Sequence, residues 1–394
     1  MEKENEIKMV VPTLRFPEFQ DTEGWKEYKL KSLCEIGNGK DYKHLGSGNI
    51  PVYGSGGYMT SVDDFLYDGE SVCIGRKGTI DKPIFLTGKF WTVDTLFYTH
   101  SFHNCLPKFL YLIFLQINWY KYNEAGGVPS LSKTTIGEIN VFVPVGKKGE
   151  LKEQQKIADC LSSLDELIEA TAQKVETLKE HKKGLMQRLF PAEGKNVPDL
   201  RFPEFQGQAT EWQSTLLGAV VDYENGRAHE NEIDDEGDFI VVNSKFISTD
   251  GEVVKRTNTP YCLADKEDIL MVLSDVPNGR AIAKCFFVDQ SGVYTVNQRI
   301  CRLRSKNVNS KLLFYLINRN PYFLSFDDGV KQTNLKKSEV LECPLMIPSS
   351  PIEQQKIADL LSSIDDLIIA TEQRIKSLAQ HQNGLMQQLF PNIL

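Results

Sequence analysis

The sequence predicts an α+β protein of two globular domains and two long helices, and three observations support this prediction. The chain repeats itself once, with matched segments at 11–20 and 197–206 and again at 153–191 and 353–391. In the second pair, apolar residues recur at alternating spacings of three and four, which indicates a helix with one apolar seam. Short β-type runs and one internal helix lie between the matched segments in each half. Two helices with one apolar seam each most simply pack on each other, antiparallel and related by a pseudo-two-fold axis.

These signals divide the 394 residues into six segments. In chain order we expect a tail and linker, a first globular domain, a central helix, a second linker, a second globular domain and a C-terminal helix: 1–24, 25–150, 151–191, 192–211, 212–350 and 351–394. The middles of the two halves, about 41–105 and 228–308, have little in common. Shared ends suggest a common scaffold or a partner used twice, whereas divergent middles suggest two different ligands.

The two long segments have the features of complete helices. They are identical at 25 of 39 positions, and Pro191 and Pro391 would end them. The second begins with Ser350-Pro-Ile-Glu353, a capping-box pattern with proline in the first turn. Lys182 and Gln382 interrupt the apolar seam at equivalent places. A helix of about 38 residues would be roughly 57 Å long, and with one apolar stripe exposed neither would be stable alone.

Polar positions of the two helices are also repeated. A plain dimerisation coiled coil explains the seam but makes no demand on outward polar residues, and recent duplication alone remains the alternative. We favour two equivalent docking surfaces for two copies of one partner, because the intervening domains have diverged. The candidate partner-binding residues are Gln154, Gln155, Asp159, Ser163, Gln354, Gln355, Asp359 and Ser363.

The globular segments show short strand-like runs and one internal helix each. In the first we expect strands at 50–53, 71–74, 90–98 and 140–144 and a helix at 107–122. In the second we expect strands at 239–243, 269–273, 281–288 and 298–303 and a helix at 310–320. This pattern is typical of an α+β domain with many loops.

The loops of both domains have side chains suited to nucleic acid. Tyr53–Gly57 and Gly75–Thr79 combine flexible backbone with donors for phosphate oxygens. Arg76 could bind guanine O6 and N7 or simply a phosphate, and the amides of the second domain suit adenine edges. Each loop alone is weak evidence, but both domains have such loops at corresponding places. The candidate residues are Lys40, Tyr53, Ser55, Gly56, Arg76, Lys77, Thr79, Arg227, Asn243, Lys245, Asn278, Arg280, Asn297, Gln298, Arg299, Lys331, Gln332 and Asn334.

Composition excludes several other classes. No stretch approaches the roughly 20 apolar residues of a membrane span, and the charged N-terminus does not look like a signal peptide. The eight cysteines form no C-x-x-C pair and histidine is scarce, which argues against a zinc site and favours free buried thiols in a reducing cytoplasm. No catalytic motif is evident. The net charge of −8 argues weakly against nucleic acid as a partner.

The order of segments and their motifs resemble the DNA specificity subunit of type I restriction–modification systems. The motifs are Leu14–Phe19, the Gly75–Thr79 loop with Trp91–Thr95, the helix start Glu153–Ala158 and the helix end Gly184–Pro191, the last two being present twice. The resemblance covers essentially the whole chain after about residue 11. The second domain departs from the pattern, because Ser274–Arg280 replaces the Gly-Arg-Lys-Gly loop and an acidic run occupies Glu230–Asp238.

The resemblance implies a division of labour among subunits. Each target-recognition domain would read one half of a bipartite, asymmetric sequence in double-stranded DNA, and the helices would set the unread spacer. Two modification subunits would dock on the chain and methylate adenine with S-adenosylmethionine, and restriction subunits would add the ATP-dependent nuclease. We therefore expect no catalysis, cofactor or metal on this chain itself. The partners would supply much of the charge that neutralises phosphate.

Two other functions remain possible from the sequence. The chain could be a structural or inhibitory protein that sequesters modification subunits without reading DNA, or, less favoured, an enzyme with an unrecognised site. If the chain reads DNA, Arg76→Ala should weaken or relax one half-site only, and insertion of one heptad into either helix should alter the spacer.

Overall fold

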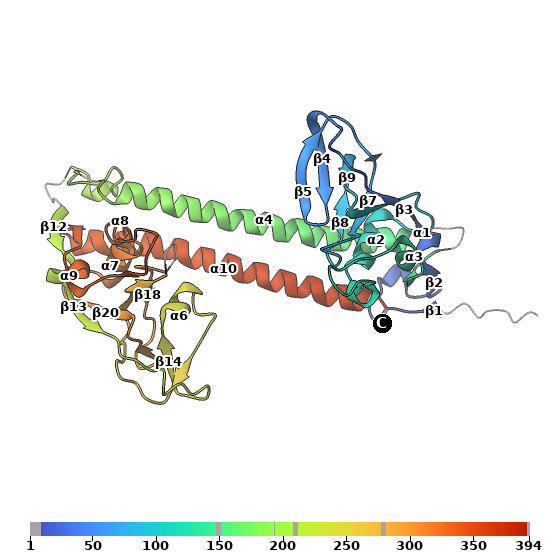
Figure 1. Cartoon of the computed structure of the whole chain (residues 1–394). Helices are drawn as coiled ribbons and strands as arrows, with labels where there is room; N and C mark the ends of the chain where they lie inside the picture. Colours follow the sequence, from blue (N-terminus) through green and yellow to red (C-terminus); the bar gives the residue numbers. More distant parts are fainter. Residues whose placement is uncertain (1–8, 147–150, 193, 208–211, 277–280, 392–394) are drawn as a thin grey trace, which may run out of the picture. The chain divides into compact units, whose positions relative to one another are not determined.

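The computed structural model divides into two compact units, each of which contains one globular domain and half of each long helix (Figure 1). The first unit comprises Met1–Ala172 and Gln373–Leu394, and the second comprises Gln173–Glu372. The structure describes residues 9–146, 151–192, 194–207, 212–276 and 281–391. The units therefore do not follow the linear segments of the sequence, since both helices are shared between them.

The long helices are α4 (Lys152–Leu189) and α10 (Pro351–Leu389). In the first unit the beginning of α4 lies beside the end of α10, because Gln382 Nε2 donates to Asp165 Oδ1 at 2.7 Å. In the second unit the roles are exchanged, and Lys182 Nζ lies 2.5 Å from Asp365 Oδ1. The helices are thus antiparallel within each unit, as predicted. The two polar interruptions of the seam are cross-helix contacts.

In its described residues the first unit contains three sheets, and the helix α2 (Pro107–Phe114) packs on β7 (Ser71–Gly75) and β8 (Ile84–Leu86) of one of them. One has the antiparallel order β3-β10-β7-β8, made by Glu35–Asn38, Leu96–His100, Ser71–Gly75 and Ile84–Leu86. The second has the order β5-β4-β9-β6, made by Gly57–Val62, Ser47–Gly54, Lys89–Thr92 and Tyr67–Asp68, with β4 and β9 parallel. The third joins β1, β2 and β11, made by Met9–Val10, Trp25–Lys29 and Asn140–Val143. The short helices α1 and α3 are Leu30–Leu33 and Lys133–Gly137.

The second unit repeats this plan with different details. Its antiparallel sheet has the order β13-β20-β16-β18, made by Val221–Asn225, Ile300–Ser305, Ile269–Val272 and Cys285–Phe287. The sheet β15-β14-β19, made by Arg256–Thr257, Phe239–Val242 and Tyr294–Val296, again contains one parallel pair, β14 with β19. Two-stranded pairings join β12 to β22 and β17 to β21: Trp212–Leu216, Pro344–Pro348, Ser274–Asp275 and Thr333–Asn334. The helices are α5, α6, α7, α8 and α9: Leu217–Val220, Ser244–Ser248, Ser310–Ile317, Pro321–Leu324 and Lys337–Leu341.

The repeated helix ends are anchored in the domain cores. In the first unit Phe390 packs against Trp25 and Phe109, with ring centroids 5.6 and 5.3 Å away. In the second unit Phe190 lies 6.3 Å from Trp212. Aromatic pairs of this kind stabilise a core beyond the area they bury. The Leu-Phe-Pro ends therefore recur because each must fill the same place in a domain.

The elements differ from the sequence prediction where turns were missed. The predicted helix 107–122 stops at Phe114 and resumes as a 3-10 turn at Trp119–Tyr122, because Trp119 Nε1 donates to the carbonyl of Phe114. The predicted strand 90–98 is two strands in different sheets, β9 and β10. The run 281–288 keeps only Cys285–Phe287 as strand, since Ala283 has a positive φ of 53°. The helix at 310–320 ends at Ile317.

Candidate DNA interface

In the first unit, three loops meet around a hollow of about 540 Å³. We call it the first hollow. The loops follow β7, precede β10 and precede α3, and together they contribute Arg76, Lys77, Asp94, Thr95, Ala125, Val128 and Ser130. Arg76 N donates to Thr95 O at 2.8 Å, and Leu131 N donates to Arg76 O at 2.9 Å. Because these bonds join main-chain atoms, they do not depend on which side chains stand at the rim. Arg76 and Lys77 are exposed at the rim.

The second unit has a corresponding hollow of about 420 Å³, which we call the second hollow. It is lined by Leu273, Ser274, Gln298, Arg299, Gln332, Asn334 and Leu335. Leu273 N donates to Arg299 O at 2.9 Å, and Leu335 N donates to Leu273 O at 2.8 Å. These loops follow β16, precede β20 and precede α9, which are the same stations as in the first unit. The sequence predicted four of these residues as separate candidates, and the structure brings them into one site.

The repeated hydrogen bonds align the two hollows residue by residue. Leu273 occupies the position of Arg76, and Arg299 occupies the position of Thr95. The pairing of Ser274 with Asn334 likewise matches that of Lys77 with Ser130. Among the described residues each hollow therefore has one guanidinium group, and the two groups come from opposite loops. The same backbone thus presents different donors in a different arrangement.

The repeated Asn-Gly-basic motif packs against the segment that leads into one loop of each hollow. A Cβ atom on Gly39 would lie 1.9 Å from Val93 O, and one on Gly226 would lie 2.1 Å from Asn297 O. Only glycine allows this close approach of two main chains. The next residues, Lys40 and Arg227, are exposed. Their amides donate to the carbonyls of the equivalent residues Thr92 and Val296, at 2.8 and 3.0 Å.

The candidate residues that follow β4 and β14, the strands with a parallel neighbour, also occupy equivalent positions in the two units. Val93 N donates to Tyr53 O at 2.9 Å and Asn297 N donates to Val242 O at 3.0 Å, so Ser55 and Gly56 correspond to Ser244 and Lys245. From this point the first unit forms the hairpin β4–β5, whereas the second forms α6. Asn243 caps α6, its Oδ1 accepting from Phe246 N at 2.9 Å. The side-chain oxygen that suited an adenine edge is therefore occupied by the helix.

The amides of the second hollow are already held by neighbours. Gln332 Nε2 donates to Ser274 Oγ at 2.7 Å, and Gln298 Nε2 donates to Glu230 Oε1 at 2.9 Å. The acidic run therefore begins beside the second hollow. Of the remaining DNA-binding candidates, Lys331 of the second unit is exposed and Asn297 is partly buried. Thr79 of the first unit is also partly buried. Asn278 and Arg280 lie outside the described residues.

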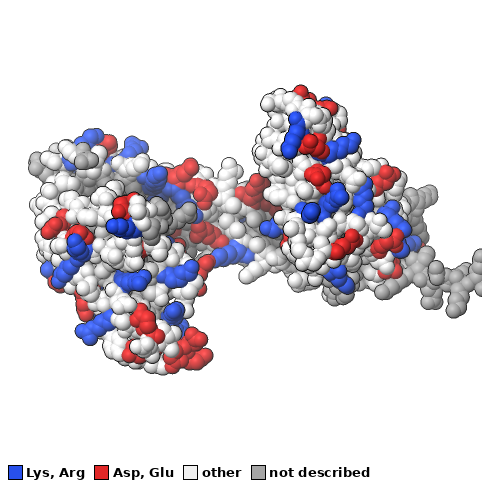
Figure 2. All heavy atoms as spheres, viewed as in Figure 1, with Lys and Arg blue, Asp and Glu red and all other residues white. Residues whose placement is uncertain are grey.

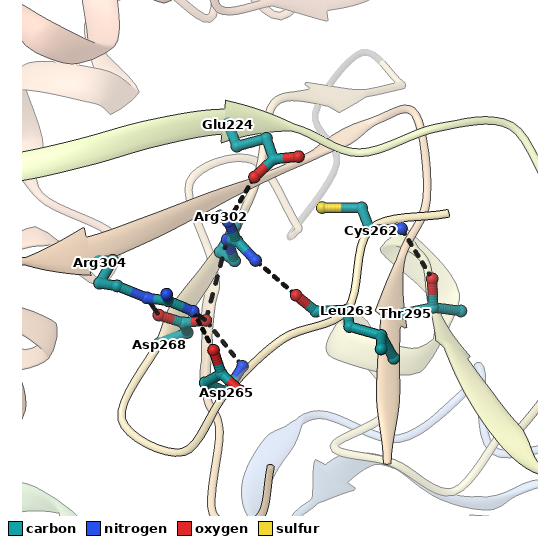
Figure 3. A network of polar contacts seen from close by, with 8 residues as sticks. All are labelled: Glu224, Cys262, Leu263, Asp265, Asp268, Thr295, Arg302 and Arg304. Carbon is teal, nitrogen blue, oxygen red and sulfur yellow. Dashed lines mark hydrogen bonds and ion pairs between the residues drawn. The ribbon is translucent and has the colours of Figure 1, made fainter. Parts of the chain in front are cut away.

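Two other arginines of the second unit, Arg302 and Arg304, form ion pairs with acidic residues (Figure 3). Arg304 Nε lies 2.7 Å from Asp268 Oδ1, and these hydrogen bonds raise the pKa of Arg304. Arg302 pairs with Glu224 and reaches Asp268 at 3.8 Å. Both arginines lie on β20, so the network ties this central strand to the segment that precedes β16. These ion pairs were not predictable from the sequence, because the partners are distant along the chain.

On the long helices, two candidate partner-binding residues are buried, so their predicted outward placement is wrong. Gln154 Oε1 accepts from Leu106 N, and its Nε2 donates to Asn104 O and Pro144 O, all at 2.9 Å. Gln354 repeats this arrangement with the backbone of Asn309 and Pro348. These glutamines satisfy main-chain groups that would otherwise be buried without partners. Their identity in the two helices therefore has an internal cause.

The repeated Leu-Arg-Phe-Pro-Glu-Phe motif has an internal cause as well. Arg15 and Glu153 form a buried two-pronged ion pair with distances of 2.7 and 2.6 Å, and Arg201 and Glu353 form the same pair at 2.6 and 2.7 Å. The glutamates of the motif, Glu18 and Glu204, pair with Lys156 and Lys356 at the surface. The motif thus fastens each domain to the start of its helix.

The remaining matched polar residues do form an exposed stripe on each helix. The stripes, called here the docking stripes, consist of Gln155, Asp159 and Ser163 on α4 and Gln355, Asp359 and Ser363 on α10. In each stripe the glutamine donates to the aspartate at 2.7 Å. The next turn exposes Leu167 and Leu367, at 39% and 44%, which the sequence reasoning missed. Their spacing of four from Ser163 and Ser363 was the signal that could have found them.

Several kinds of chemistry find no support in the described part of the chain. Its described residues contain no group of three or more His, Cys, Asp or Glu that could hold a metal ion. All eight cysteines are free thiols and seven are buried. Burial raises the pKa of Cys34, Cys73 and Cys301 to about 12, so these thiols are protonated at neutral pH and are poor nucleophiles. Within the described residues, no helix has the length and apolar character needed to cross a membrane.

Comparison with known proteins gives a consistent answer. The chain is 24% identical over 82% of its length to the type I restriction enzyme MjaVIII specificity subunit of Methanocaldococcus jannaschii, of which it covers 77%. It is 25% identical over 71% of its length to the putative MjaX specificity subunit of the same organism, of which it covers 66%. The fold matches the crystal structure of a type I restriction–modification S subunit from M. genitalium with a TM-score of 0.67, at 16% identity, over 97% of this chain and 100% of that one. The family model described as the type I restriction modification DNA specificity domain matches twice, at residues 22–180 and 209–380. These two matches confirm the resemblance seen in the motifs, and the chain belongs to the family of type I restriction–modification DNA specificity proteins.

Proposed function

We propose that the chain reads a bipartite, asymmetric DNA sequence, with the first hollow contacting one half and the second hollow the other. The observation that carries the proposal is the alignment of the two hollows. The same three loops and the same main-chain hydrogen bonds build both, but the side chains at the rims differ. Two hollows with the same backbone but different rim side chains would bind two DNA sequences of different base composition.

The side chains indicate how each half would be read. In the first hollow the exposed guanidinium of Arg76 would donate to guanine O6 and N7, and Lys77 suits an adjacent phosphate. In the second, Arg299 supplies the guanidinium, and the amide of Asn334 suits an adenine edge. The amides of Gln298 and Gln332 would do the same after releasing Glu230 Oε1 and Ser274 Oγ. Asp94, at the rim of the first hollow, is exposed and could accept from cytosine N4. The two half-sites should therefore differ in base composition.

We propose further that the docking stripes bind two copies of a modification subunit, one on each helix. Equal stripes on α4 and α10 support equal partners. The burial of Gln154 and Gln354 removes them from the candidates. The remaining repeated residues are exposed, so packing within the domains does not explain why they recur. Restriction subunits would join the same complex, and the long helices would set the length of the unread spacer between the half-sites.

The charge of the chain supports dependence on these partners. With a net charge of −8, this chain alone would bind DNA weakly. Figure 2 shows basic and acidic side chains interspersed over the face drawn, without a continuous basic stripe. The modification subunits would supply the missing positive charge, together with S-adenosylmethionine and the methylation chemistry. ATP would be used by the restriction subunits, and this chain would act in the cytoplasm without catalysis or cofactor of its own.

The test is co-expression of the full chain with its modification partner, followed by mapping of methylated adenines in the host DNA. We expect a complex with two partner copies per chain and a split motif with an unread spacer. A contiguous palindromic motif would contradict reading by two different domains. Partner binding without any sequence-specific footprint would instead show that the chain sequesters modification subunits.

A further inference from the structure

The hairpin β4–β5 of the first unit carries an exposed apolar pair that the hollow itself does not include. Figure 1 shows the hairpin extending from the rest of its domain. Tyr58 is 63% exposed and Met59 is 51% exposed, near the start of β5 and shortly after the Ser55–Gly56 turn. The second unit has the short helix α6 at this station, with Lys245 in place of Gly56. The apolar pair is therefore a property of the first recognition domain alone.

Contacts of the hairpin place the pair beside the first hollow. A Cβ atom on Gly54 would lie 2.8 Å from Met59 Sδ and 3.4 Å from Val93 Cγ2, so Met59 lies across the glycine toward Val93. Val93 directly precedes two residues that line the hollow. On the other side, a Cβ atom on Gly78 would lie 3.3 Å from Ser55 Oγ. The hairpin thus borders both the loop that carries Arg76 and the loop that faces it.

The orientation of the pair distinguishes two ways of contacting DNA. A wedge between base pairs needs an apolar side chain at the extreme tip of the inserted element. Here the tip is the turn Ser55–Gly56, since Gly54 pairs with Gly57. Neither tip residue is apolar, and the ideal Cβ position of Gly56 has nothing within 4 Å. Tyr58 is held along the flank, with its hydroxyl 3.1 Å from Ser61 Oγ and its ring 6.1 Å from that of Tyr53.

A tip of small residues permits close approach to the DNA backbone. Tyr58 lies on the face of Tyr53 and Met59 on the face of Gly54, so the two side chains lie on opposite faces of the hairpin. Both faces of an inserted hairpin then flank base edges.

We propose that Tyr58 and Met59 contact thymine methyl groups in the major groove of the half-site read by the first domain. Apolar contact with the C5-methyl group is the way that such side chains distinguish thymine. The proposal rests on the proposed DNA reading and adds to it a second set of read bases beside those reached by Arg76. The second domain, which has no such pair at this station, would read its half-site by polar contacts there.

The experiment measures DNA binding by the complex of the full chain with its modification partner. The duplex contains the methylated motif, and each thymine of the first half-site is replaced in turn by deoxyuridine, which removes only the methyl group. The unaltered complex should bind about fourfold more weakly at one or two of these positions, the effect of burying roughly one methyl group less. Met59→Ala or Tyr58→Ala should weaken binding to the thymine duplex by at least about fourfold. One of the two variants should no longer distinguish thymine from uracil.

Phe65→Ala is the matched control, since Phe65 is an exposed aromatic residue in the segment that follows β5, away from the hairpin turn. It should retain the full thymine preference. A half-site without thymine, equal binding of thymine and uracil by the unaltered complex, or an equal effect of Phe65→Ala would each overturn the proposal. So would variants that lose the modification partner but keep the DNA preference, because the hairpin would then be a protein contact. Absence of any sequence-specific binding by the unaltered complex would overturn the proposed function as well.

Discussion

The two hollows differ in their side chains and agree in their backbone. Leu273 N bonds Arg299 O just as Arg76 N bonds Thr95 O, and the glycines of the Asn-Gly-basic motif approach the opposite chain equally closely. A recognition site of this kind can change its rim residues without disturbing the loops, because no rim side chain is needed for the main-chain bonds. In contrast, the arginine–glutamate ion pairs that fasten each domain to its helix are the same in both units. What varies is the surface proposed to face the DNA, and what is repeated holds the fold together.

The largest expected effect comes from the repeated ion pairs. Glu153→Ala leaves Arg15 as an uncompensated buried charge in the first unit, and Glu353→Ala does the same to Arg201 in the second. Each should cost about 3–5 kcal/mol of stability. Glu153 also accepts from Trp25 Nε1 at 3.1 Å, whereas Trp212 Nε1 has no hydrogen-bond partner among the described residues. The first substitution should therefore cost about 1 kcal/mol more.

Hydrogen exchange resolved by peptide measures this effect, because it reports on each unit separately. Glu18→Ala is the matched control, since it removes an exposed partner of Lys156 and should cost about 0–1 kcal/mol. If Glu153→Ala costs no more than Glu18→Ala, the buried pair does not fasten the domain. Destabilisation of both units by either substitution would show that they do not unfold independently.

The sequence was most informative where a repeat could be compared with itself. The seam, the ends of the helices and the polar interruptions at Lys182 and Gln382 were predictable because they recur with helical spacing. The same comparison misled for Gln154 and Gln354, since identity in two copies does not separate an outward contact from a buried one. Their partners are backbone atoms up to 50 residues away, such as Asn104 O, and no local pattern predicts them.

The candidate site was predictable as a set of loops but not as two hollows. Arg76, Gln298, Arg299 and Gln332 were found from residue type alone. Their assembly depends on strand order, which places the loop after β7 beside the loop before β10 although about 20 residues separate them. Turn geometry was the least predictable feature. The positive φ of Ala283, for example, has no signal in an apolar run.

A smaller effect is expected from the two guanidinium groups at the rims. Arg76→Ala should relax or weaken reading of one half-site, and Arg299→Ala should do the same to the other half-site only. The expected loss is about 1–3 kcal/mol, roughly a tenfold to hundredfold loss of discrimination at one base pair. Binding is measured for the partner complex with duplexes randomised in one half-site at a time.

Arg188→Ala serves as the control, because it removes the same charge from an exposed position on α4. It should weaken binding to all sequences slightly or not at all. If Arg76→Ala and Arg299→Ala affect the same half-site, the correspondence of the two hollows with two half-sites is wrong. A uniform loss across all sequences would assign the arginine concerned to a phosphate.

The smallest expected effect concerns the docking stripes, where the two units should behave alike. Leu167→Ala and Leu367→Ala each remove the exposed leucine of one stripe, and each should weaken one of two partner sites by about tenfold. Native mass spectrometry at limiting partner concentration should then show one modification subunit per chain for each single variant and none for the double variant. Leu115→Ala removes an equally exposed leucine at the end of α2 and should leave two. Retention of two partners by the double variant would separate the repeated stripes from partner binding, and the identity of their exposed residues would then be explained by duplication alone.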